Sequence, residues 1–448
     1  MIETLISQKI RSKFPYLRTN SEVIYLDNAA TSLMPESVIE AMARYMRAAG
    51  GSAGRGQSEI TQKITRLQRE LKKSVAGFFG AESEESIAVR SATEALNGIV
   101  RGWGENNLVA NDQILLCMAE HHSHVVPWQM MALRNGWEVQ FFTPDMETGK
   151  IDLVALDQKM RTMPNLQYVG VAQVSNVLGV RNPVREITKR IKRLNEERRE
   201  RNNGEEQRKK GGGRPIRLGV DGAQGAVEGF SGVKGAGFSA SGVDFYTFSG
   251  HKMFGPTNIG GLLVRKELIE NGEMQPWMFG GGAINRVTTK STETKLANNI
   301  QQQFEAGTID VMGLVGLVAA MQFILELEMK YGLTREDLAQ HKVDLAKKLK
   351  EDIRERAEIK DKFEFLPAEN EEVEIVTMIS KKYHPQDVAN YLDSQKIAIR
   401  VGQHCAQLIH EASKVEETIR FSFGPFNTKT EIERVVEKMA QIGNFIAG

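Results

Sequence analysis

Cysteine is almost absent from this sequence, which contains only Cys117 and Cys405 among 448 residues. Two cysteines so far apart exclude a disulfide-stabilised scaffold and a metal cluster built on cysteine ligands. Free thiols persist in a reducing compartment, so we expect a cytoplasmic protein. The composition leaves one question open. Cys405, in the stretch IAIRVGQHCAQ (397–407), either packs in the core or takes part in chemistry.

An excess of one charge and long apolar runs are also lacking. Lys and Arg number 58 and Asp and Glu 57, for a formal net charge of +1. No overall field therefore attracts nucleic acid or a membrane, and we expect neither as a partner. No apolar run reaches the ~18 residues of a membrane-spanning helix. The N-terminal MIETLISQKIRSKFPYL carries charges throughout, which predicts an amphipathic helix and not a signal peptide.

Short runs rich in apolar and β-branched residues alternate with helical patterns through most of the chain. The predicted strands are 86–91, 113–119, 138–143, 167–175, 216–221, 244–249 and 260–265, and the predicted helices include Ser37–Ala49, Ile60–Phe79 and Val184–Glu200. Several strands are apolar at nearly every position, as strands buried on both faces are. The pattern predicts an α/β fold with a mainly parallel sheet wrapped by helices. Such sheets bind ligands at the carboxyl ends of their strands.

The pattern changes after residue 310, where VMGLVGLVAAMQFILELEMKYG predicts a long, mostly apolar helix. Further elements are predicted as strands at 372–380, 397–401 and 418–424, a helix near Gln386–Gln395 and a final helix from Lys429. We therefore expect an N-terminal helical segment over 1–24 that packs with the small domain, a large domain over 25–310 and a smaller C-terminal α+β domain over 311–448.

A charged, glycine-rich segment stands out at 189–215. It carries eleven Lys or Arg and five Glu, and it contains three consecutive glycines. This composition is typical of a helix end that runs into a solvated loop, and we expect an insertion at about 196–214. A basic arm that holds nucleic acid or an acidic partner is the alternative.

Two charged residues follow predicted strands of the sheet. Lys252 lies in SGHKMFGP, where an amine of lowered pKa could form a Schiff base with an aldehyde. An ordinary surface lysine is the alternative. Asp221 ends a buried strand in VDGAQG, where a carboxylate needs a partner. It either caps a turn or pairs with a positively charged ring nitrogen.

Three further motifs point to a planar, phosphorylated ligand. Ser91, Ala92 and Thr93 open a helix, whose N-terminus suits one phosphate or merely an N-cap. The histidines of AEHHSHVVPW could bind zinc, although the chain has no matching cysteine pair or HExxH pattern. Alternatively, one of these histidine rings stacks on a planar cofactor. Asn176 in VSNVLG could donate to a phenolic oxygen. Together with Lys252 and Asp221, these groups describe pyridoxal 5'-phosphate, and no metal is expected.

The ordered set of motifs resembles the class V aminotransferase family of pyridoxal-phosphate enzymes, and within it the branch of cysteine desulfurases and selenocysteine lyases. The matching stretches run in order over nearly the whole chain: YLDNAAT, SATEALN, EHHSHVVPWQ, VSNVLG, VDGAQG, SGHKMFGPTNIGGLLV, GGG (280–282), FEAGT and IRVGQHCAQ. The resemblance implies the fold type I architecture of pyridoxal-phosphate-dependent transferases, with a large cofactor-binding domain and a smaller domain that carries the thiol loop.

The resemblance also implies a role for each matching residue. Lys252 and Cys405 would be catalytic, the first bound to the cofactor and the second taking sulfur as a persulfide, and His121 would stack on the ring and take part in catalysis. The other cofactor ligands would be Asp221 at the ring nitrogen, Asn176 and Gln224 at the phenolate oxygen, and Thr93, Ser249, His251 and, across a homodimer, Thr308 at the phosphate. Arg420 would bind the substrate carboxylate, with Arg400 and Asn176 in the same pocket.

The implied activity is that of a cysteine desulfurase, which converts L-cysteine to L-alanine. The sulfur on Cys405 would pass to an acceptor or scaffold protein for iron–sulfur cluster assembly or thiolation. Selenocysteine lyase, another lyase or aminotransferase of the family with Cys405 idle, and a binding protein on the same fold are alternatives.

The chain departs from the family pattern at three places. Gly54 and Ser58 stand where the family has histidines around Arg55, and Gln403 stands where the thiol motif has its first histidine. The third departure is the charged insertion. Proton transfer near the thiol would then depend on His404.

Overall fold

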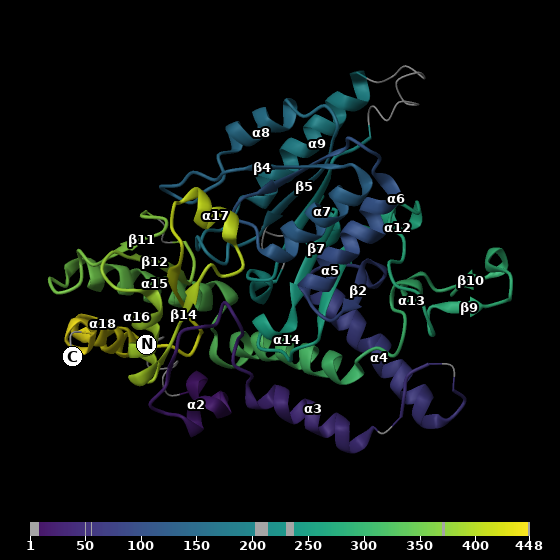
Figure 1. Cartoon of the computed structure of the whole chain (residues 1–448). Helices are drawn as coiled ribbons and strands as arrows, with labels where there is room; N and C mark the ends of the chain where they lie inside the picture. The colour runs from purple at the N-terminus through teal and green to yellow at the C-terminus, as the bar shows by residue number, and fades with distance from the viewer. Residues whose placement is uncertain are drawn as a thin grey trace.

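The computed structural model describes residues 9–49, 51–54, 56–201, 214–229, 237–369 and 372–446. The chain forms a large lobe around a seven-stranded sheet and a smaller lobe around a four-stranded sheet (Figure 1). The two lobes lie side by side, with the N-terminal segment and α3 (Glu36–Ala48) along one edge of the molecule.

The large sheet has the order β2-β8-β7-β6-β5-β3-β4. Its strands are β2 (Ser86–Val89), β3 (Gln113–Cys117), β4 (Glu138–Phe142), β5 (Leu166–Ala172), β6 (Arg217–Asp221), β7 (Phe245–Ser249) and β8 (Gly260–Val264). Strand β8 runs antiparallel to both of its neighbours, and the other described pairings of this sheet are parallel. All seven predicted strands and the mainly parallel sheet are confirmed. Every residue of β5 is buried, as its continuous apolar run predicts.

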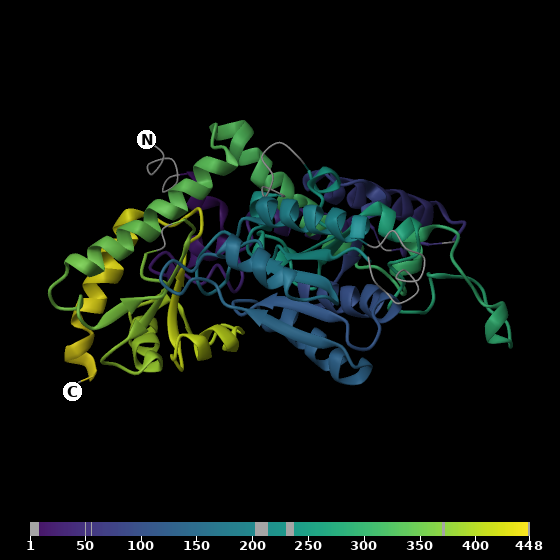
Figure 2. The same cartoon turned by 90° about the horizontal axis from the view of Figure 1, so that it is seen from above.

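Helices cover both faces of this sheet (Figure 2). On one face Leu115 of β3 packs in a core shared with α4 (Glu59–Phe78), α8 (Leu153–Arg161), α9 (Val184–Arg201) and α14 (Val311–Tyr331). On the other face its neighbours Ile114 and Leu116 pack with α5 (Ala92–Gly98) and α7 (His122–Asn135). The change of face between adjacent residues follows from the two-residue repeat of a strand.

Helix α14 is the long apolar helix expected after residue 310, and it begins at the N-cap Asp310 and ends at Gly332 in the left-handed conformation. Among the described residues it is the one helix long and apolar enough to cross a membrane, with a mean hydropathy of 1.7 over its most apolar window. Gln322, Glu326 and Glu328 interrupt its apolar sequence, so the helix contains no uninterrupted apolar run of ~18 residues. Buried residues make up 67% of that window, which is the pattern of a core helix.

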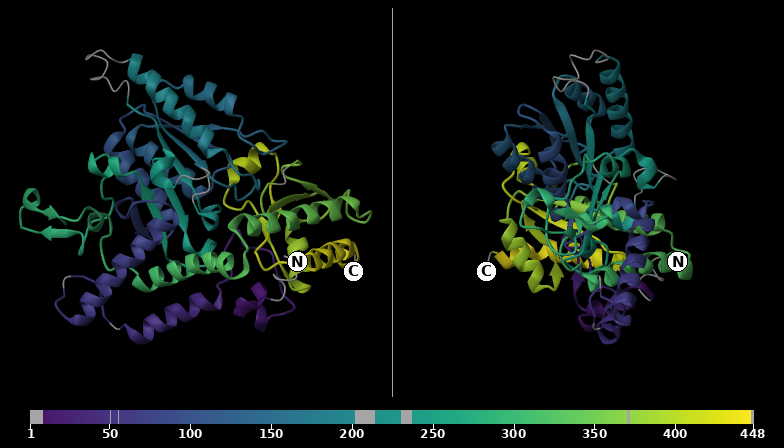
Figure 3. Two further views of the ribbon diagram at one scale, coloured as in Figure 1. Left: turned by 180° about the vertical axis from the view of Figure 1, so that it is seen from behind. Right: turned by 90° about the vertical axis from the view of Figure 1, so that its right-hand side faces the viewer.

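The small lobe is built on the antiparallel sheet β11-β12-β15-β14. Its strands are β11 (Phe363–Phe365), β12 (Ile375–Ser380), β15 (Thr418–Ser422) and β14 (Arg400–Gly402), and its helices are α15 (Arg335–Glu355), α16 (Pro385–Ser394), α17 (Gln407–Ala412) and α18 (Lys429–Ile446). Figure 3 shows α15 and α18 on one side of this lobe, at the end of the molecule away from the hairpin of β9 (Ile284–Arg286) and β10 (Lys295–Leu296). The predicted strands and helices of this region are present, with 397–401 divided into β13 (Ile397–Ala398) and β14.

The N-terminal segment is not one amphipathic helix. Its described part consists of a short turn, η2 (Arg11–Lys13), and α2 (Pro15–Thr19), with Phe14 extended between them. The interruption lies at Phe14 because a residue before proline is disfavoured in the helical conformation. The segment touches the small lobe through an ion pair of 2.6 Å between Arg11 and Glu431, and β1 (Ile24–Tyr25) pairs with β13.

The charged insertion begins as helix, since α9 continues to Arg201. Residues 202–213 of the expected loop lie outside the described residues. The chain re-enters the fold at Arg214, whose guanidinium contacts the carboxylate of Asp112 at 2.6 Å. The described chain therefore ends at Arg201 and begins again at Arg214, directly before β6 of the large lobe.

Candidate active site

A cavity of about 330 Å³ lies at the carboxyl ends of the large-sheet strands, where the small lobe meets the large one. Eleven of the twelve residues expected at the site line it: Thr93, His121, Asn176, Asp221, Gln224, Ser249, His251, Lys252, Arg400, Cys405 and Arg420. The twelfth, Thr308, does not. The structure thus brings together side chains that are more than 300 positions apart in the chain.

Lys252 lies in the turn η6 (Gly250–Lys252) that follows β7. Desolvation lowers the pKa of its ammonium to about 8, although the nearby Asp221 carboxylate opposes this shift. The amine is therefore partly neutral near pH 8, whereas an ordinary lysine is almost fully protonated there. A neutral amine is the form that attacks an aldehyde.

Asp221 ends β6 with its side chain buried at 6% exposure. One carboxylate oxygen accepts from the backbone N–H of Ala223 at 2.9 Å and from the Thr247 hydroxyl at 3.5 Å. No lysine, arginine or histidine nitrogen lies within ion-pair distance of it among the residues that the structure describes. A buried carboxylate without a cationic partner fits a ligand that brings a positive charge.

The N-terminus of α5 lies at the cavity and can bind an anion there. Ser91 is the N-cap of this helix, and the Ser249 hydroxyl accepts from the backbone N–H of Ala92 at 2.8 Å. The Thr93 and Ser123 hydroxyls lie 2.8 Å apart at the edge of the cavity. His251 also lines the cavity, and desolvation together with Lys252 lowers its pKa to about 4. Neutral donors therefore surround this end of the cavity.

The three histidines of the EHHSH stretch have three different environments. His121 lines the cavity, and its Nδ1 accepts from the backbone N–H of Ser123 at 3.0 Å. Burial, followed by the charge of Lys252, lowers its pKa to about 4, so the ring is neutral. His124 lies in the core between Glu120 at 2.7 Å and Tyr168 at 3.0 Å. No group of three metal-ligating side chains occurs among the described residues, which leaves the zinc alternative without support there.

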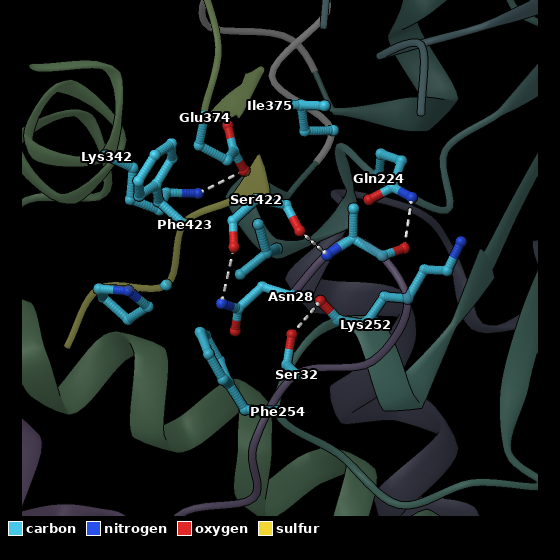
Figure 4. A pocket seen from close by; sticks show the side chains of 14 residues that line it. Asn28, Ser32, Gln224, Lys252, Phe254, Lys342, Glu374, Ile375, Ser422 and Phe423 are labelled. Carbon is cyan, nitrogen blue, oxygen red and sulfur yellow. Dashed lines mark hydrogen bonds and ion pairs between the residues drawn. The ribbon is translucent and has the colours of Figure 1, made fainter. Parts of the chain in front are cut away.

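The two amides expected at a phenolic oxygen both point their nitrogen at a backbone carbonyl. Asn176 donates to the carbonyl of His404 at 2.7 Å. Gln224 donates to the carbonyl of Ala29 at 2.8 Å, as Figure 4 shows. Each amide nitrogen carries a second hydrogen, so both can still donate to a ligand in the cavity that they line.

Asp27 is a site residue that the sequence reasoning missed. Arg420, only 2% exposed, donates to the Asp27 carboxylate at 3.2 Å and to the Asn176 carbonyl at 3.1 Å. Arg400 reaches the same carboxylate at 2.9 Å. Asp27 belongs to YLDNAAT, so the motif was visible, but nothing local relates it to arginines almost 400 positions later. One carboxylate thus holds two guanidinium groups at the cavity.

Cys405 lies at the cavity and is exposed, whereas Cys117 is buried within β3. His404 and Cys405 both adopt left-handed φ angles, of 51° and 57°, and Gly402 has a φ of 111°. The loop is attached to the histidine stretch, because the backbone N–H of His122 donates to the Cys405 carbonyl at 2.7 Å. The His122 ring in turn accepts from the backbone N–H of Gln407 at 3.0 Å. The fold therefore presents the thiol of Cys405 at the cavity.

The positions that depart from the family pattern have local roles. Ser58 caps α4, its hydroxyl accepting from the backbone N–H of Thr61 at 3.3 Å, and Arg55 lies outside the described residues. The Gln403 amide donates to the carbonyl of Glu416 at 3.3 Å. Neither Ser58 nor Gln403 lines the cavity.

Thr308 is exposed and lies away from this cavity, beyond α13 (Ile300–Phe304). Its neighbour Gly307 donates to the carbonyl of Gly281 at 2.7 Å, so the FEAGT and GGG stretches pack together. From the same region the hairpin of β9 (Ile284–Arg286) and β10 (Lys295–Leu296) projects from the large lobe (Figure 1). A single chain thus does not bring Thr308 to its own cavity.

A second, smaller cavity of about 30 Å³ borders Lys252 and Gln224 on the side of the small lobe (Figure 4). Lys342 and Glu374 form an ion pair of 2.6 Å at its wall. Its volume suits about one water molecule. The larger cavity is therefore the candidate active site.

Comparison with known proteins agrees with this geometry. The family Aminotransferase class-V matches residues 24–196 and 213–435 of the chain. A cysteine desulfurase of Klebsiella pneumoniae (strain 342) is 31% identical over 443 residues, covering 98% of each chain. The solved structure of the cysteine desulfurase CsdA from Escherichia coli matches with a TM-score of 0.80 and 27% identity over 98% of each chain. A cysteine desulfurase from Thermococcus onnurineus NA1 matches with a TM-score of 0.80 and 29% identity over 97% of each chain. The chain belongs to the class-V aminotransferase family and has its fold type I architecture.

Proposed function

We propose that this protein is a pyridoxal-phosphate-dependent cysteine desulfurase, which converts L-cysteine to L-alanine and takes the sulfur on Cys405. One observation carries the proposal: a single cavity joins an amine of lowered pKa, two arginines and an exposed thiol. Relatives that align over the whole chain bear the name cysteine desulfurase, which supports the same activity.

The residues present fit pyridoxal phosphate. The buried Asp221 lacks a cationic partner and would pair with the ring nitrogen, and the neutral His121 ring would stack on the ring face. Asn176 and Gln224 would donate to the phenolic oxygen, and Thr93, Ser249 and His251 would hold the phosphate. When bound to Lys252, this cofactor withdraws electrons from the carbon skeleton of an amino acid.

Substrate binding is assigned to the arginines. Both line the cavity, and burial lowers the pKa of Arg420 only to about 10, so it stays positively charged at neutral pH. A guanidinium can bind a carboxylate through two parallel hydrogen bonds. Arg420, with Arg400 beside it, would therefore hold the carboxylate of L-cysteine. Asn176 lines the same pocket and would contact the substrate there.

The proton transfers and the sulfur transfer are assigned to Lys252 and Cys405. Lys252, with its lowered pKa, would accept the proton from the substrate α-carbon. The thiolate of Cys405 would attack the substrate sulfur. The bond between Cβ and Sγ of the substrate would break as a sulfur–sulfur bond forms on Cys405. Cβ would take up the proton of the substrate thiol, and Lys252 would return its proton to the α-carbon, so that the products are L-alanine and a persulfide.

A persulfide on the exposed Cys405 can transfer its outer sulfur to another protein. We assign its sulfur to an acceptor or scaffold protein, for iron–sulfur cluster assembly or thiolation, in the cytoplasm. We also assign a homodimer in which Thr308 of each subunit completes the phosphate site of the other. Its exposed position away from its own cavity supports this assignment.

The test is to add L-cysteine to purified protein with its cofactor and to measure alanine and protein-bound persulfide. Wild type should form both. Lys252→Ala should form neither, and Cys405→Ser should lose the persulfide and most of the alanine. Cys117→Ser is the matched control, because burial in β3 raises the pKa of Cys117 far above its usual range and keeps it inert. Alanine formation that survives in Cys405→Ser would overturn the sulfur-transfer role. Faster alanine formation from L-selenocysteine than from L-cysteine in the same assay would indicate a selenocysteine lyase instead.

A further inference from the structure

Helices α7 and α17 begin beside each other at the thiol loop (residues 402–407). His122 is the first residue of α7 and Gln407 is the first residue of α17. The first backbone N–H groups of a helix have no partner within that helix. Ala406, the N-cap of α17, has no side-chain acceptor to offer. The first N–H of each helix therefore depends on an acceptor from another part of the chain.

His122 takes part in both of the resulting hydrogen bonds. Its backbone N–H donates to the Cys405 carbonyl at 2.7 Å. Its ring Nε2 accepts from the Gln407 N–H at 3.0 Å, so Nε2 carries a lone pair and the hydrogen of the ring is on Nδ1. The two hydrogen bonds lie on either side of Ala406. One residue of the large lobe thus holds the thiol loop at two points.

Apolar packing also holds this segment but does not orient it. Ala406 and Ile409 pack in a core cluster that includes Cys117 and Val177 of the large lobe. Apolar contacts are not directional, so they keep α17 against the large lobe without fixing its exact position. Hydrogen bonds need a donor and an acceptor about 3 Å apart and in line. The position of the thiol loop on the large lobe is therefore set by its hydrogen bonds to His122.

The residues on either side of His122 line the cavity, whereas His122 itself does not. The Ser123 hydroxyl lies 2.8 Å from the Thr93 hydroxyl. The proposed function, on which this inference rests, assigns the cofactor ring to His121 and its phosphate to Thr93. The outer residues of the turn 121–123 would then face the cofactor, while its middle residue holds the thiol loop.

A second attachment of the loop comes from another cofactor residue. Asn176, assigned to the phenolic oxygen, donates to the His404 carbonyl at 2.7 Å. The large lobe thus holds the loop at residues 404, 405 and 407, through Asn176 and His122. A ligand that fixes Asn176 and the turn 121–123 would fix these attachments as well.

We infer that His122 is a positioning residue that attaches the thiol loop to the cofactor-binding turn, so that Cys405 is held more firmly at the cavity when the cofactor is bound. A cofactor that orders the turn also orders the loop attached to it. By linkage, the attached loop strengthens cofactor binding by the same factor. Neither effect needs contact between His122 and the cofactor or the substrate.

Hydrogen exchange of the Gln407 amide tests the attachment. In wild type this amide should exchange more slowly in the holoenzyme than in the apoprotein. His122→Leu keeps bulk but offers no acceptor, so the amide of its holoenzyme should exchange about fivefold faster, the ~1 kcal/mol of one hydrogen bond. His122→Gln keeps an acceptor and should stay within about twofold of wild type. Unchanged exchange in His122→Leu, or equal exchange in wild-type apoprotein and holoenzyme, would overturn the inference.

His384 provides the matched control. Its ring Nδ1 accepts from the Gln386 N–H at 3.2 Å at the beginning of α16, and it does not line the cavity. His384→Leu should speed exchange at Gln386 and leave the Gln407 amide unchanged. The Gln386 amide of wild type should exchange equally in apoprotein and holoenzyme. Faster exchange at both amides on cofactor removal would indicate general loosening and refute a specific attachment.

The second test separates the position of the thiol from the rest of the site. With saturating cofactor, His122→Leu should lower the rate of persulfide formation on Cys405 about fivefold, and His122→Gln should restore it. Exchange of the α-proton of L-alanine for deuterium uses Lys252 and the arginines but not the thiol, and it should stay within about twofold. An equal loss in both reactions would refute a role specific to the thiol. Failure of the proposed function would appear separately, as wild type that forms no persulfide, and the Gln407 measurement does not depend on that outcome.

Discussion

The guanidinium of Arg420 donates to the carboxylate of Asp27 at 3.2 Å, across 393 positions of the chain. The ion pair joins β15 of the small lobe to the segment after β1, and Arg400 shares the same carboxylate. Arg420 is almost fully buried, so its charge depends on this partner. A substrate carboxylate would enter a place where a protein carboxylate already neutralises two arginines.

The first prediction concerns that ion pair. Asp27→Asn should lower the free energy of unfolding by about 3 kcal/mol, because a buried cation then lacks its counter-charge. Saturating L-alanine should restore more stability to this variant than to wild type, since its carboxylate supplies the missing charge. Chemical denaturation with and without L-alanine measures both effects.

Glu326→Gln is the control for this measurement. It removes an ion pair with Lys330 on the surface of α14, where both side chains are largely exposed, and should change stability by less than about 1 kcal/mol. Equal destabilisation of the two variants would show that Asp27 does not neutralise a buried charge.

The second prediction concerns the pH dependence of Lys252. Its pKa of about 8 means that the amine is protonated below about pH 8 and neutral above it. The rate at which the apoprotein bonds pyridoxal phosphate at Lys252 should therefore rise with pH to a plateau above about pH 8. Borohydride trapping followed by mass spectrometry of the Lys252 peptide measures this rate.

Asp221→Asn tests how the neighbouring carboxylate changes the pKa of Lys252. The Asp221 carboxylate raises the pKa of Lys252, so its removal should move the midpoint to lower pH. A midpoint that moves upward, or a wild-type midpoint near that of an ordinary lysine, would contradict the desolvated environment of this amine.

The third prediction concerns the backbone of the thiol loop. Gly402 has a φ of 111°, which an L side chain rarely adopts, although a Cβ there would meet no atom within 4 Å. Gly402→Ala should therefore strain the loop by about 1 kcal/mol or more and lower the rate of persulfide formation on Cys405. Hydrogen exchange of residues 402–407 should become faster.

Gly281→Ala is the matched substitution. A Cβ at this position also meets nothing within 4 Å, and the backbone is not in the left-handed region. It should leave the exchange of the thiol loop unchanged, so a comparable effect of both variants would argue against backbone strain at Gly402.

The fourth prediction concerns a buried ion pair within the large lobe. Lys72 of α4 contacts Glu305 at 2.7 Å, and the second oxygen of Glu305 accepts from the backbone N–H of Ala88 in β2 at 3.0 Å. Lys72→Met should destabilise the protein by about 3 kcal/mol because it leaves the Glu305 carboxylate buried and unpaired. Thermal or chemical unfolding measures the loss.

The double variant Lys72→Met, Glu305→Gln should recover part of this loss, because a neutral amide can still accept from the Ala88 N–H. Additive losses in the double variant would show that the two side chains are not coupled.

Local pattern was sufficient for most of the secondary structure. The apolar runs predicted all seven strands of the large sheet, because strands buried on both faces need apolar residues at nearly every position. The same reasoning failed at Phe14, where one proline interrupts the amphipathic pattern.

The members of the candidate site could be named from their place after strands and from the order of the motifs. Lys252 and Asp221 were expected in one site because the carboxyl ends of parallel strands meet at one edge of the sheet, whereas Cys405 was added to it only by the family resemblance. Their partners could not be named. Asp27 stands in a recognisable motif, yet its two arginines come from strands of another lobe.

The sequence by itself therefore determined the strands of the large sheet, most of the helices and all of the expected cavity residues except Thr308, because these depend on short-range patterns and on the order of motifs. The tertiary structure alone decided which charges neutralise one another. That property depends on contacts of about 3 Å between side chains from different elements, as between Asp27, Arg400 and Arg420. No local pattern in the sequence specifies such contacts.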